Sequence, residues 1–144
     1  SVILDLFAGS GAIGIEFISR GAKKAYFCEN SHLASEMIRK NLIRTHFIDK
    51  AEIIEKDYKK CLLELGNRNI KFDTIFLDPP YKKDLSATAV DLIISLNLLK
   101  EDGLIIVETD EEKRDLEKLE KMQVKVNDLR KYGRACLIFL SRKE

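Results

Sequence analysis

The stretch DLFAGSGAIG, Asp5–Gly14, joins a short apolar run to a segment with helical periodicity through a loop that is rich in glycine. The run that includes its first residues, Val2–Leu6, has the length and apolar character of a buried strand. The segment after the loop stops at Gly21, and glycine commonly ends a helix. A strand, a G-x-G-x-x-G loop and a helix in this order begin a βαβ unit. The stretch therefore predicts an α/β fold built on a parallel sheet.

The rest of the chain continues to alternate strand-like and helix-like segments until its last two segments, which are both strand-like. Two strand-like runs that meet at Gly133 close the chain and predict an antiparallel hairpin at one edge of the sheet. We therefore predict an α/β fold with a mostly parallel seven-stranded sheet, helices on both faces and a C-terminal antiparallel hairpin. In such a doubly wound sheet, ligands bind beyond the carboxyl ends of the strands, here between the first and fourth strands. The predicted strands cover residues 2–6, 25–29, 51–55, 72–78, 104–108, 124–132 and 134–141, and the predicted helices cover 12–21, 31–44, 58–65 and 84–99, with one more after 109.

Two of these helices carry more specific expectations. Ser31 is expected to cap the helix over residues 31–44, because serine is a favoured N-cap residue. Thr109 and Glu112 have the spacing of a capping box at the start of the last helix. The buried face of the helix over 31–44 is predicted to hold Leu33, Met37, Ile38 and Leu42.

Composition limits the class of protein. The 144 residues fit one domain over residues 1–144, and a net charge of +1 gives no strong polyelectrolyte signature. Three cysteines at irregular spacings argue against a disulfide framework or a metal site and fit a reducing cytoplasm. No apolar run approaches the roughly 20 residues that span a bilayer, so no membrane partner is expected. The chain begins inside a predicted core strand without methionine, and we expect that an N-terminal segment is absent.

The glycine loop is a candidate cofactor site, although such a loop can also be a tight turn between strand and helix. Asp5 lies at the mouth of the first strand, where it would repel the pyrophosphate of a dinucleotide and suit a ligand with an ammonium group. S-adenosylmethionine has such a group, a ribose and an adenine, and it has no phosphate. Glu29 follows the second strand and is placed to accept hydrogen bonds from ribose hydroxyls, a position that NAD-binding proteins also use.

The end of the predicted third strand offers residues for an adenine ring. Asp57 has two interpretations that both stay open: it could accept a hydrogen bond from the adenine amino group, or it could cap the next helix. Tyr58 or Asn30 could flank the ring. These positions extend the candidate cofactor site from the first strand to the third.

The stretch LDPPYKK, Leu77–Lys83, sets two prolines directly after the predicted fourth strand. Proline fixes φ and removes a donor, so the stiff turn through Pro80 would hold Asp78 and the Pro79 carbonyl in one relation. Two such acceptors could each take an N–H of an exocyclic amine and aim the nitrogen lone pair at a methyl donor. Tyr81 could stack on an extruded base. The tetrapeptide therefore indicates amine methylation, unless it merely ends a strand.

The segments LDLFAGSGAIGIEFISRGA (residues 4–22) and FDTIFLDPPY (residues 72–81), with their separation, resemble the bacterial small-subunit rRNA guanine-N2 methyltransferase family (RsmD-like). This resemblance implies a Rossmann-like class I S-adenosylmethionine-dependent methyltransferase fold and a single catalytic domain. It implies a guanine of 16S rRNA as target, within a partly assembled small ribosomal subunit. It assigns the chemistry of the target amine to Asp78, Pro79, Pro80 and Tyr81. It assigns cofactor contacts to Asp5, Phe7, Gly9, Ser10, Gly11, Glu29, Asn30, Asp57 and Tyr58.

Other functions share parts of this pattern. A DNA adenine-N6 methyltransferase has the same tetrapeptide, but it usually needs a target-recognition region, for which this chain has no room. A non-catalytic, cofactor-binding RNA-assembly factor need not keep the sequence of Asp78–Tyr81. A small-molecule N-methyltransferase is disfavoured because no lid insertion is evident. We expect a monomer in the cytoplasm.

Overall fold

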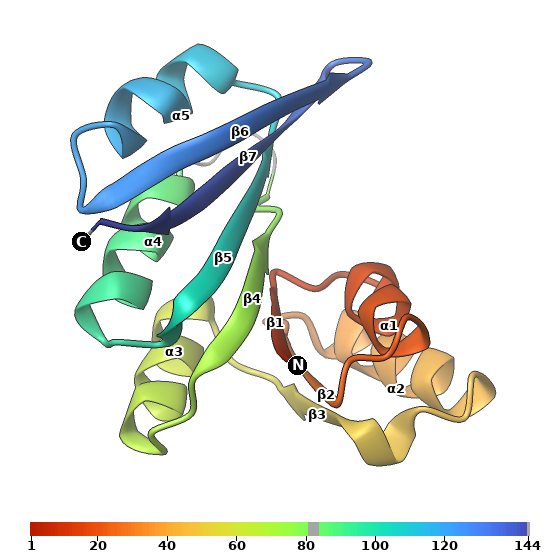
Figure 1. Ribbon diagram of the computed structural model, residues 1–144. Helices are drawn as coiled ribbons and strands as arrows, with labels where there is room; N and C mark the ends of the chain where they lie inside the picture. Colours follow the sequence, from red (N-terminus) through yellow and green to blue (C-terminus); the bar gives the residue numbers. More distant parts are fainter. Residues whose placement is uncertain (81–83, 144) are drawn as a thin grey trace.

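The computed structural model describes residues 1–80 and 84–143. Within these residues seven strands form one sheet in the order β3-β2-β1-β4-β5-β7-β6 (Figure 1). The ladders from β3 to β5 are parallel, and β7 pairs in the antiparallel sense with both β5 and β6. The predicted fold class and the terminal hairpin are confirmed. The strands are β1 Val2–Leu6, β2 Lys24–Cys28, β3 Ala51–Ile54, β4 Phe72–Leu77, β5 Leu99–Thr109, β6 Val124–Tyr132 and β7 Ala135–Arg142.

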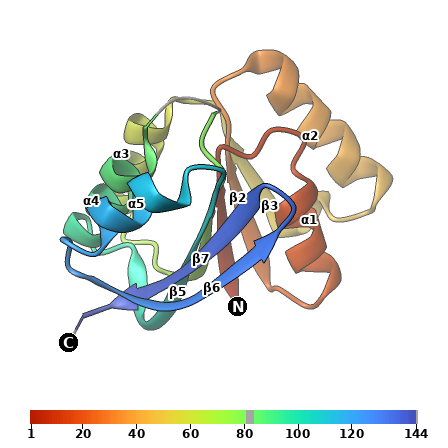
Figure 2. The same cartoon turned by 90° about the horizontal axis from the view of Figure 1, so that it is seen from above.

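Helices cover both faces of the sheet, α1 and α2 on one side and α3, α4 and α5 on the other (Figure 2). Alternate residues of β1 serve the two sides, as the two-residue period of a strand requires. Ile3 packs in the cluster with Ile38 of α2, whereas Leu4 and Leu6 pack in the larger cluster on the opposite side. No helix in the described part of the chain is long and apolar enough to cross a membrane. The helices are α1 Ala12–Ser19, α2 His32–Arg44, α3 Tyr58–Asn67, α4 Ser86–Ser95 and α5 Glu112–Leu119, with a 3-10 turn at Ile48–Lys50.

Helix α2 confirms its predicted cap but only half of its predicted buried face. The Ser31 hydroxyl accepts a hydrogen bond from the Ala34 N–H at 3.2 Å. Ile38 and Leu42 are fully buried. Leu33 and Met37 are 83% and 52% exposed, because the helix packs on the sheet along a narrower stripe than the apolar pattern suggested.

The second half of the chain differs from the prediction in its boundaries. Strand β5 begins at Leu99, five residues before the predicted start, and the Asp102–Gly103 pair lies inside the strand. The irregular pairing between β4 and β5, where the register shifts after Phe72, accommodates this pair without ending the ladder. Helix α4 is shorter than predicted at both ends. The Thr109 hydroxyl accepts from the Glu111 N–H at 2.9 Å, a local turn in place of the predicted capping box.

Candidate functional site

Two carboxylates from neighbouring strands hold the glycine loop after β1. Gly9 and Gly11 have φ of 57° and 81°, a conformation that glycine adopts at little cost. Asp5 Oδ2 accepts a hydrogen bond from the Gly14 N–H at 3.0 Å, and Glu29 Oε1 accepts from the Gly9 N–H at 2.9 Å. The loop is therefore fixed by side chains of β1 and of the residue after β2.

Asp5 lies deeper than the sequence suggested. Its side chain is 2% exposed and points to the side of the sheet that α1 covers, where it accepts the hydrogen bond from the backbone of α1. The pKa of Asp5 is raised to about 7, mainly by burial and also by the charges of Asp78 and Glu29, against the opposing effect of the Gly14 N–H. Asp5 thus stabilises the loop through the start of α1. It is not among the residues that line the two cavities described next.

A first cavity of about 460 Å³ opens beyond the carboxyl ends of β1, β2 and β3. It brings together the predicted residues Phe7, Glu29, Asn30, Asp57 and Tyr58, with Asp78 and Pro80 at its other end. The rings of Phe7 and Tyr58 stack in a tilted arrangement with centroids 5.2 Å apart. The predicted loop residues Gly9, Ser10 and Gly11 do not line it. Sequence reasoning missed Cys28, Lys56 and Leu85, although Cys28 and Lys56 stand beside predicted residues at strand ends.

Phe7 carries the most unusual backbone of the first cavity. Its φ of 64° lies in the left-handed region, which a bulky side chain rarely adopts. Conformations of this kind cost roughly 1–3 kcal/mol and gather at functional sites. The turn that begins at Phe7 lets the loop leave β1 sharply and places the Phe7 ring in the cavity against Tyr58.

Asp57 and Glu29 each accept hydrogen bonds from the backbone and also line the first cavity. Asp57 Oδ1 accepts from the N–H groups of Lys59 and Lys60 at 2.9 and 3.2 Å, so the capping interpretation of this residue is confirmed. Glu29 Oε2 accepts from the Ser31 N–H at 2.9 Å in addition to its contact with Gly9. A carboxylate offers about four acceptor positions, so both residues retain capacity for donors of a ligand.

A second cavity of about 410 Å³ lies on the other side of the β4 end. Asp78 and Pro80 line both cavities, and Pro79 lines the second. Partial loss of hydration raises the pKa of Asp78 to about 6, with further contributions from the negative charges of Glu108 and Asp110. Tyr81 lies outside the described residues. The remaining lining residues come from α4, β5, the residue after β5, α5 and β7: Ser86, Glu108, Thr109, Asp110, Arg114, Asp115 and Ala135.

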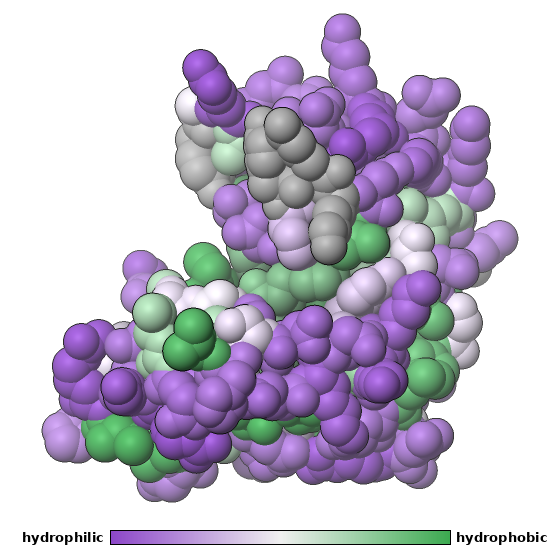
Figure 3. Space-filling view, turned by 180° about the vertical axis from the view of Figure 1, so that it is seen from behind, coloured by the Kyte–Doolittle hydropathy of each residue, from purple (hydrophilic) through white to green (hydrophobic). Residues whose placement is uncertain are grey.

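The molecular surface has a hollow. The face opposite to that of Figure 1 is hollowed, with hydrophobic residues at the base of the hollow and hydrophilic residues around it (Figure 3). A hollow with an apolar floor and a few polar groups is the usual form of a small-molecule site. Because the two cavities share Asp78, a ligand in one and a ligand in the other would meet at this carboxylate.

Comparison with known proteins agrees with the fold and with the motifs. The family described as Conserved hypothetical protein 95 matches residues 1–141. Ribosomal RNA small subunit methyltransferase D of Haemophilus influenzae is 39% identical over 114 residues, which cover 78% of this chain and 58% of the relative. The Escherichia coli protein of the same name is 32% identical over 109 residues, covering 76% and 53%. The chain thus spans between half and three fifths of the length of these relatives.

Solved structures give the same result. The crystal structure of a Haemophilus influenzae protein, HI0767, superposes with a TM-score of 0.80 at 31% identity, covering all of this chain and 88% of that one. A conserved hypothetical protein from Streptococcus pyogenes superposes with a TM-score of 0.83 at 27% identity, covering 99% and 86%. The resemblance drawn from the two motifs is confirmed. With a Rossmann-like class I methyltransferase fold and a family match over nearly its whole length, the chain belongs to the Conserved hypothetical protein 95 family.

Proposed function

We propose that residues 1–144 form the catalytic domain of an S-adenosylmethionine-dependent enzyme that methylates N2 of a guanine in 16S rRNA. The observation that carries the proposal is the position of Asp78 between the two cavities. A methyl donor in the first cavity and an amine in the second would meet where a hydrogen-bond acceptor is already present. The names of the relatives, small-subunit rRNA methyltransferases, support RNA as the substrate and do not favour DNA.

The residues of the first cavity fit S-adenosylmethionine. Lys56, the cation among its described lining residues, is paired with Glu64 at 2.5 Å, so the cavity offers little to a phosphate. Glu29 would accept hydrogen bonds from the ribose hydroxyls, and Asp57 would accept one from the adenine amino group. Tyr58, with the neighbouring Phe7 and Asn30, would flank the adenine. When bound, this cofactor supplies an electrophilic methyl group on a sulfonium.

The residues at the β4 end would prepare the amine. Asp78 and the Pro79 carbonyl each accept one N–H of the guanine N2 group, which turns the nitrogen lone pair toward the methyl carbon. The cofactor held by the first cavity would supply the methyl group and be released as a neutral thioether. The positive charge passes to the nitrogen, which then loses a proton to Asp78 or to water. The raised pKa of Asp78, about 6, suits a carboxyl group that accepts this proton near neutral pH.

The proposal also covers the particle that presents the guanine and the oligomeric state of the enzyme. We infer that the guanine is presented by a partly assembled small ribosomal subunit and that the enzyme works as a monomer in the cytoplasm. The chain has a net charge of +1 and no strong overall attraction for RNA. An assembled particle would supply the shape and the extruded base that a weakly charged protein needs.

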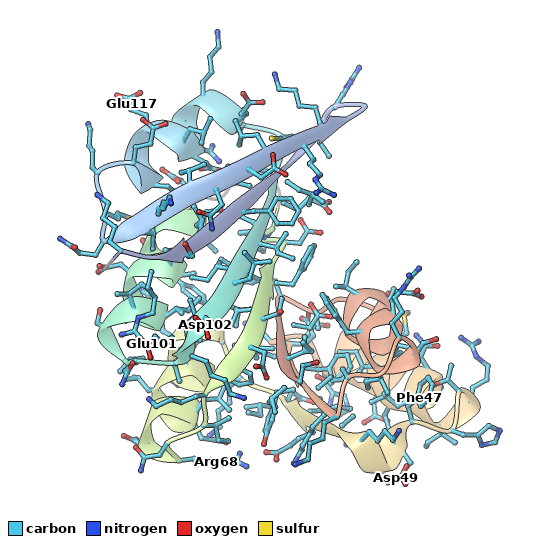
Figure 4. The ribbon with its side chains drawn as sticks, in the orientation of Figure 1. Phe47, Asp49, Arg68, Glu101, Asp102 and Glu117 are labelled. Atoms are coloured by element: carbon cyan, nitrogen blue, oxygen red, sulfur yellow. The ribbon has the colours of Figure 1, made fainter. Side chains whose placement is uncertain are left out.

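Substitution of Asp78 separates binding from chemistry. In full-length protein, Asp78→Ala is expected to lower methyl transfer into undermethylated small subunits at least about 100-fold, because an acceptor for the amine is lost. Cofactor affinity, measured by calorimetry, should stay within a few-fold of wild type. Asp102→Ala, an exposed aspartate at the opposite end of β5, is the matched control and should retain activity (Figure 4). Wild-type transfer rates in Asp78→Ala would overturn the mechanism.

A further inference from the structure

The second cavity is rich in carboxylates. Asp78, Glu108, Asp110 and Asp115 line it, and Arg114 is the one cation among its described lining residues. Arg114 is itself engaged, with its Nε 3.2 Å from Asp115 and 3.7 Å from Asp84. A cavity with this charge would repel a phosphate and accept a group that presents several hydrogen-bond donors.

The second cavity has the size of a ligand site, and a buried carboxylate lies in its wall. Asp115 is 1% exposed, and its Oδ1 accepts from the Arg114 Nε–H. Its Oδ2 has no hydrogen-bond partner among the described residues. Buried polar atoms are nearly always paired, so this carboxylate carries a cost in free energy within the wall of the cavity. The volume of about 410 Å³ lies in the range of roughly 300–1,000 Å³ typical of ligand sites.

The register of the sheet places Glu108 next to Asp78. Leu77 of β4 pairs with Val107 of β5 in a parallel ladder, so the following residues, Asp78 and Glu108, stand side by side. Neighbouring strands lie about 4.8 Å apart. Glu108 is half-buried and takes part in further interactions. A carboxylate with about four acceptor positions can add another donor to these.

We propose that Glu108 selects guanine by accepting the N1–H of the base while Asp78 accepts from the adjacent N2 amine. This inference rests on the proposed function. Guanine presents N1–H and the N2 amine as neighbouring donors, and two neighbouring carboxylates match that edge. Adenine and cytosine each place an acceptor nitrogen beside their amine, and a carboxylate would repel its lone pair. Glu108 is therefore a specificity residue that reads the atom next to the reacting amine.

The base analogue 2-aminopurine tests this contact, because it keeps the 2-amine but has an acceptor at N1. It also lacks O6, so the N1 contact is read from how Glu108→Gln changes the preference between the two bases. Small subunits would be reconstituted with 16S rRNA that carries guanosine or 2-aminopurine riboside at the position that wild-type enzyme modifies. Wild type is expected to prefer guanosine in kcat/KM by at least about 100-fold. Glu108→Gln should lower kcat/KM for guanosine about 10- to 100-fold and raise it for 2-aminopurine, because the glutamine amide can donate to N1.

A second readout uses pH. The charge of Glu108 raises the pKa of Asp78, so Glu108→Gln should move the acid limb of the guanosine pH profile to lower pH. Glu101→Gln makes the same substitution at the far end of β5 and is the matched control (Figure 4). Thermal melting and cofactor binding establish that the variants are folded.

These measurements test the role of Glu108 separately from the proposed methylation of guanine. A narrowed guanosine preference together with the shifted acid limb supports the role of Glu108. If wild type methylates guanosine but Glu108→Gln leaves the preference for guanosine unchanged, Glu108 is not the specificity residue and the proposed function stands. If wild type places no methyl group on guanosine, the proposed function itself fails.

Discussion

At the scale of single residues, Asp5 lies near the end of β1 and Asp78 directly follows the neighbouring strand β4, and yet the two residues have different roles. Both have a raised pKa, Asp5 because it is buried under α1 and Asp78 because it has lost part of its hydration beside other acids. Asp5 fixes the glycine loop through the Gly14 N–H. Asp78 faces both cavities. The difference comes from what covers each side chain, because the two strands end at the same edge of the sheet.

The buried Asp5 should make stability fall as pH rises. The folded state keeps the Asp5 proton up to a pH of about 7, whereas the unfolded chain loses it near 3.8. The free energy of unfolding therefore decreases between about pH 4 and pH 7, by an amount on the order of 4 kcal/mol, and levels off above. Asp5→Asn keeps an oxygen for the Gly14 N–H but carries no titrating proton.

Urea titrations of wild type and Asp5→Asn check this expectation. The two proteins should be similarly stable near pH 4, and Asp5→Asn should be the more stable one at pH 8. Asp102→Asn, an exposed aspartate on β5, controls for general charge effects. Parallel curves for wild type and Asp5→Asn across this range would show that Asp5 is ionised in the folded protein.

What the sequence could predict about these residues follows from the same physics. The strand-loop-helix pattern was enough to place Asp5, Glu29 and Asp78 at the ligand-binding edge of the sheet. The glycine pattern allows α1 to pack closely on the sheet, but the burial of Asp5 also depends on which face of β1 its side chain occupies, and the pattern does not give that face. Glu108 was missed because its position beside Asp78 depends on the register between β4 and β5, a long-range property of the sheet.

At the scale of elements, the third glycine of the loop sets the distance between α1 and the sheet. A Cβ at Gly14 would lie 2.3 Å from the ring of Phe27 in β2, closer than two carbon atoms can approach. Helix α1 therefore rests on Phe27 across a position that only glycine fits. The same close approach lets the Gly14 N–H reach Asp5.

Two alanine substitutions test this packing. Gly14→Ala should lower the free energy of unfolding by about 1–3 kcal/mol, since the new methyl group overpacks the contact with Phe27. Gly66→Ala in α3 should instead raise it by about 0.5–1 kcal/mol, because its Cβ would meet Leu96 at an ordinary 3.5 Å and alanine favours the helix. Urea denaturation measures both. A stabilised Gly14→Ala protein would contradict the close packing of α1.

Element boundaries show where local patterns stop being sufficient. Strands β1 and β6 match their predicted bounds, and Gly133 marks the end of β6. Strand β5 starts earlier than predicted because Leu99 already pairs with Phe72 of β4, and the Asp102–Gly103 pair lies in the irregularity before pairing resumes at Leu104. The exposed Leu33 and Met37 reflect the same limit, since the width of a buried stripe is set by what packs on it.

At the scale of the whole molecule, the strand order produces the site. With β4 between β1 and β5, the end of β4 separates a cavity beside β1, β2 and β3 from a cavity beside β5 and α5 (Figure 1). Asp78 stands on this divide. The antiparallel hairpin β6–β7 extends the sheet on the side of the second cavity, where Ala135 of β7 contributes to the wall. One fold thus offers two sites that meet at a single carboxylate.

We propose that the first cavity holds a methyl donor and the second a guanine, and one experiment tests this most directly. Full-length protein would be incubated with isotope-labelled S-adenosylmethionine and undermethylated small ribosomal subunits, and the labelled nucleoside would be identified by mass spectrometry after digestion. The label is expected as N2-methylguanosine in 16S rRNA. Label in any other nucleoside, or no label from protein that binds the cofactor, would contradict the proposal.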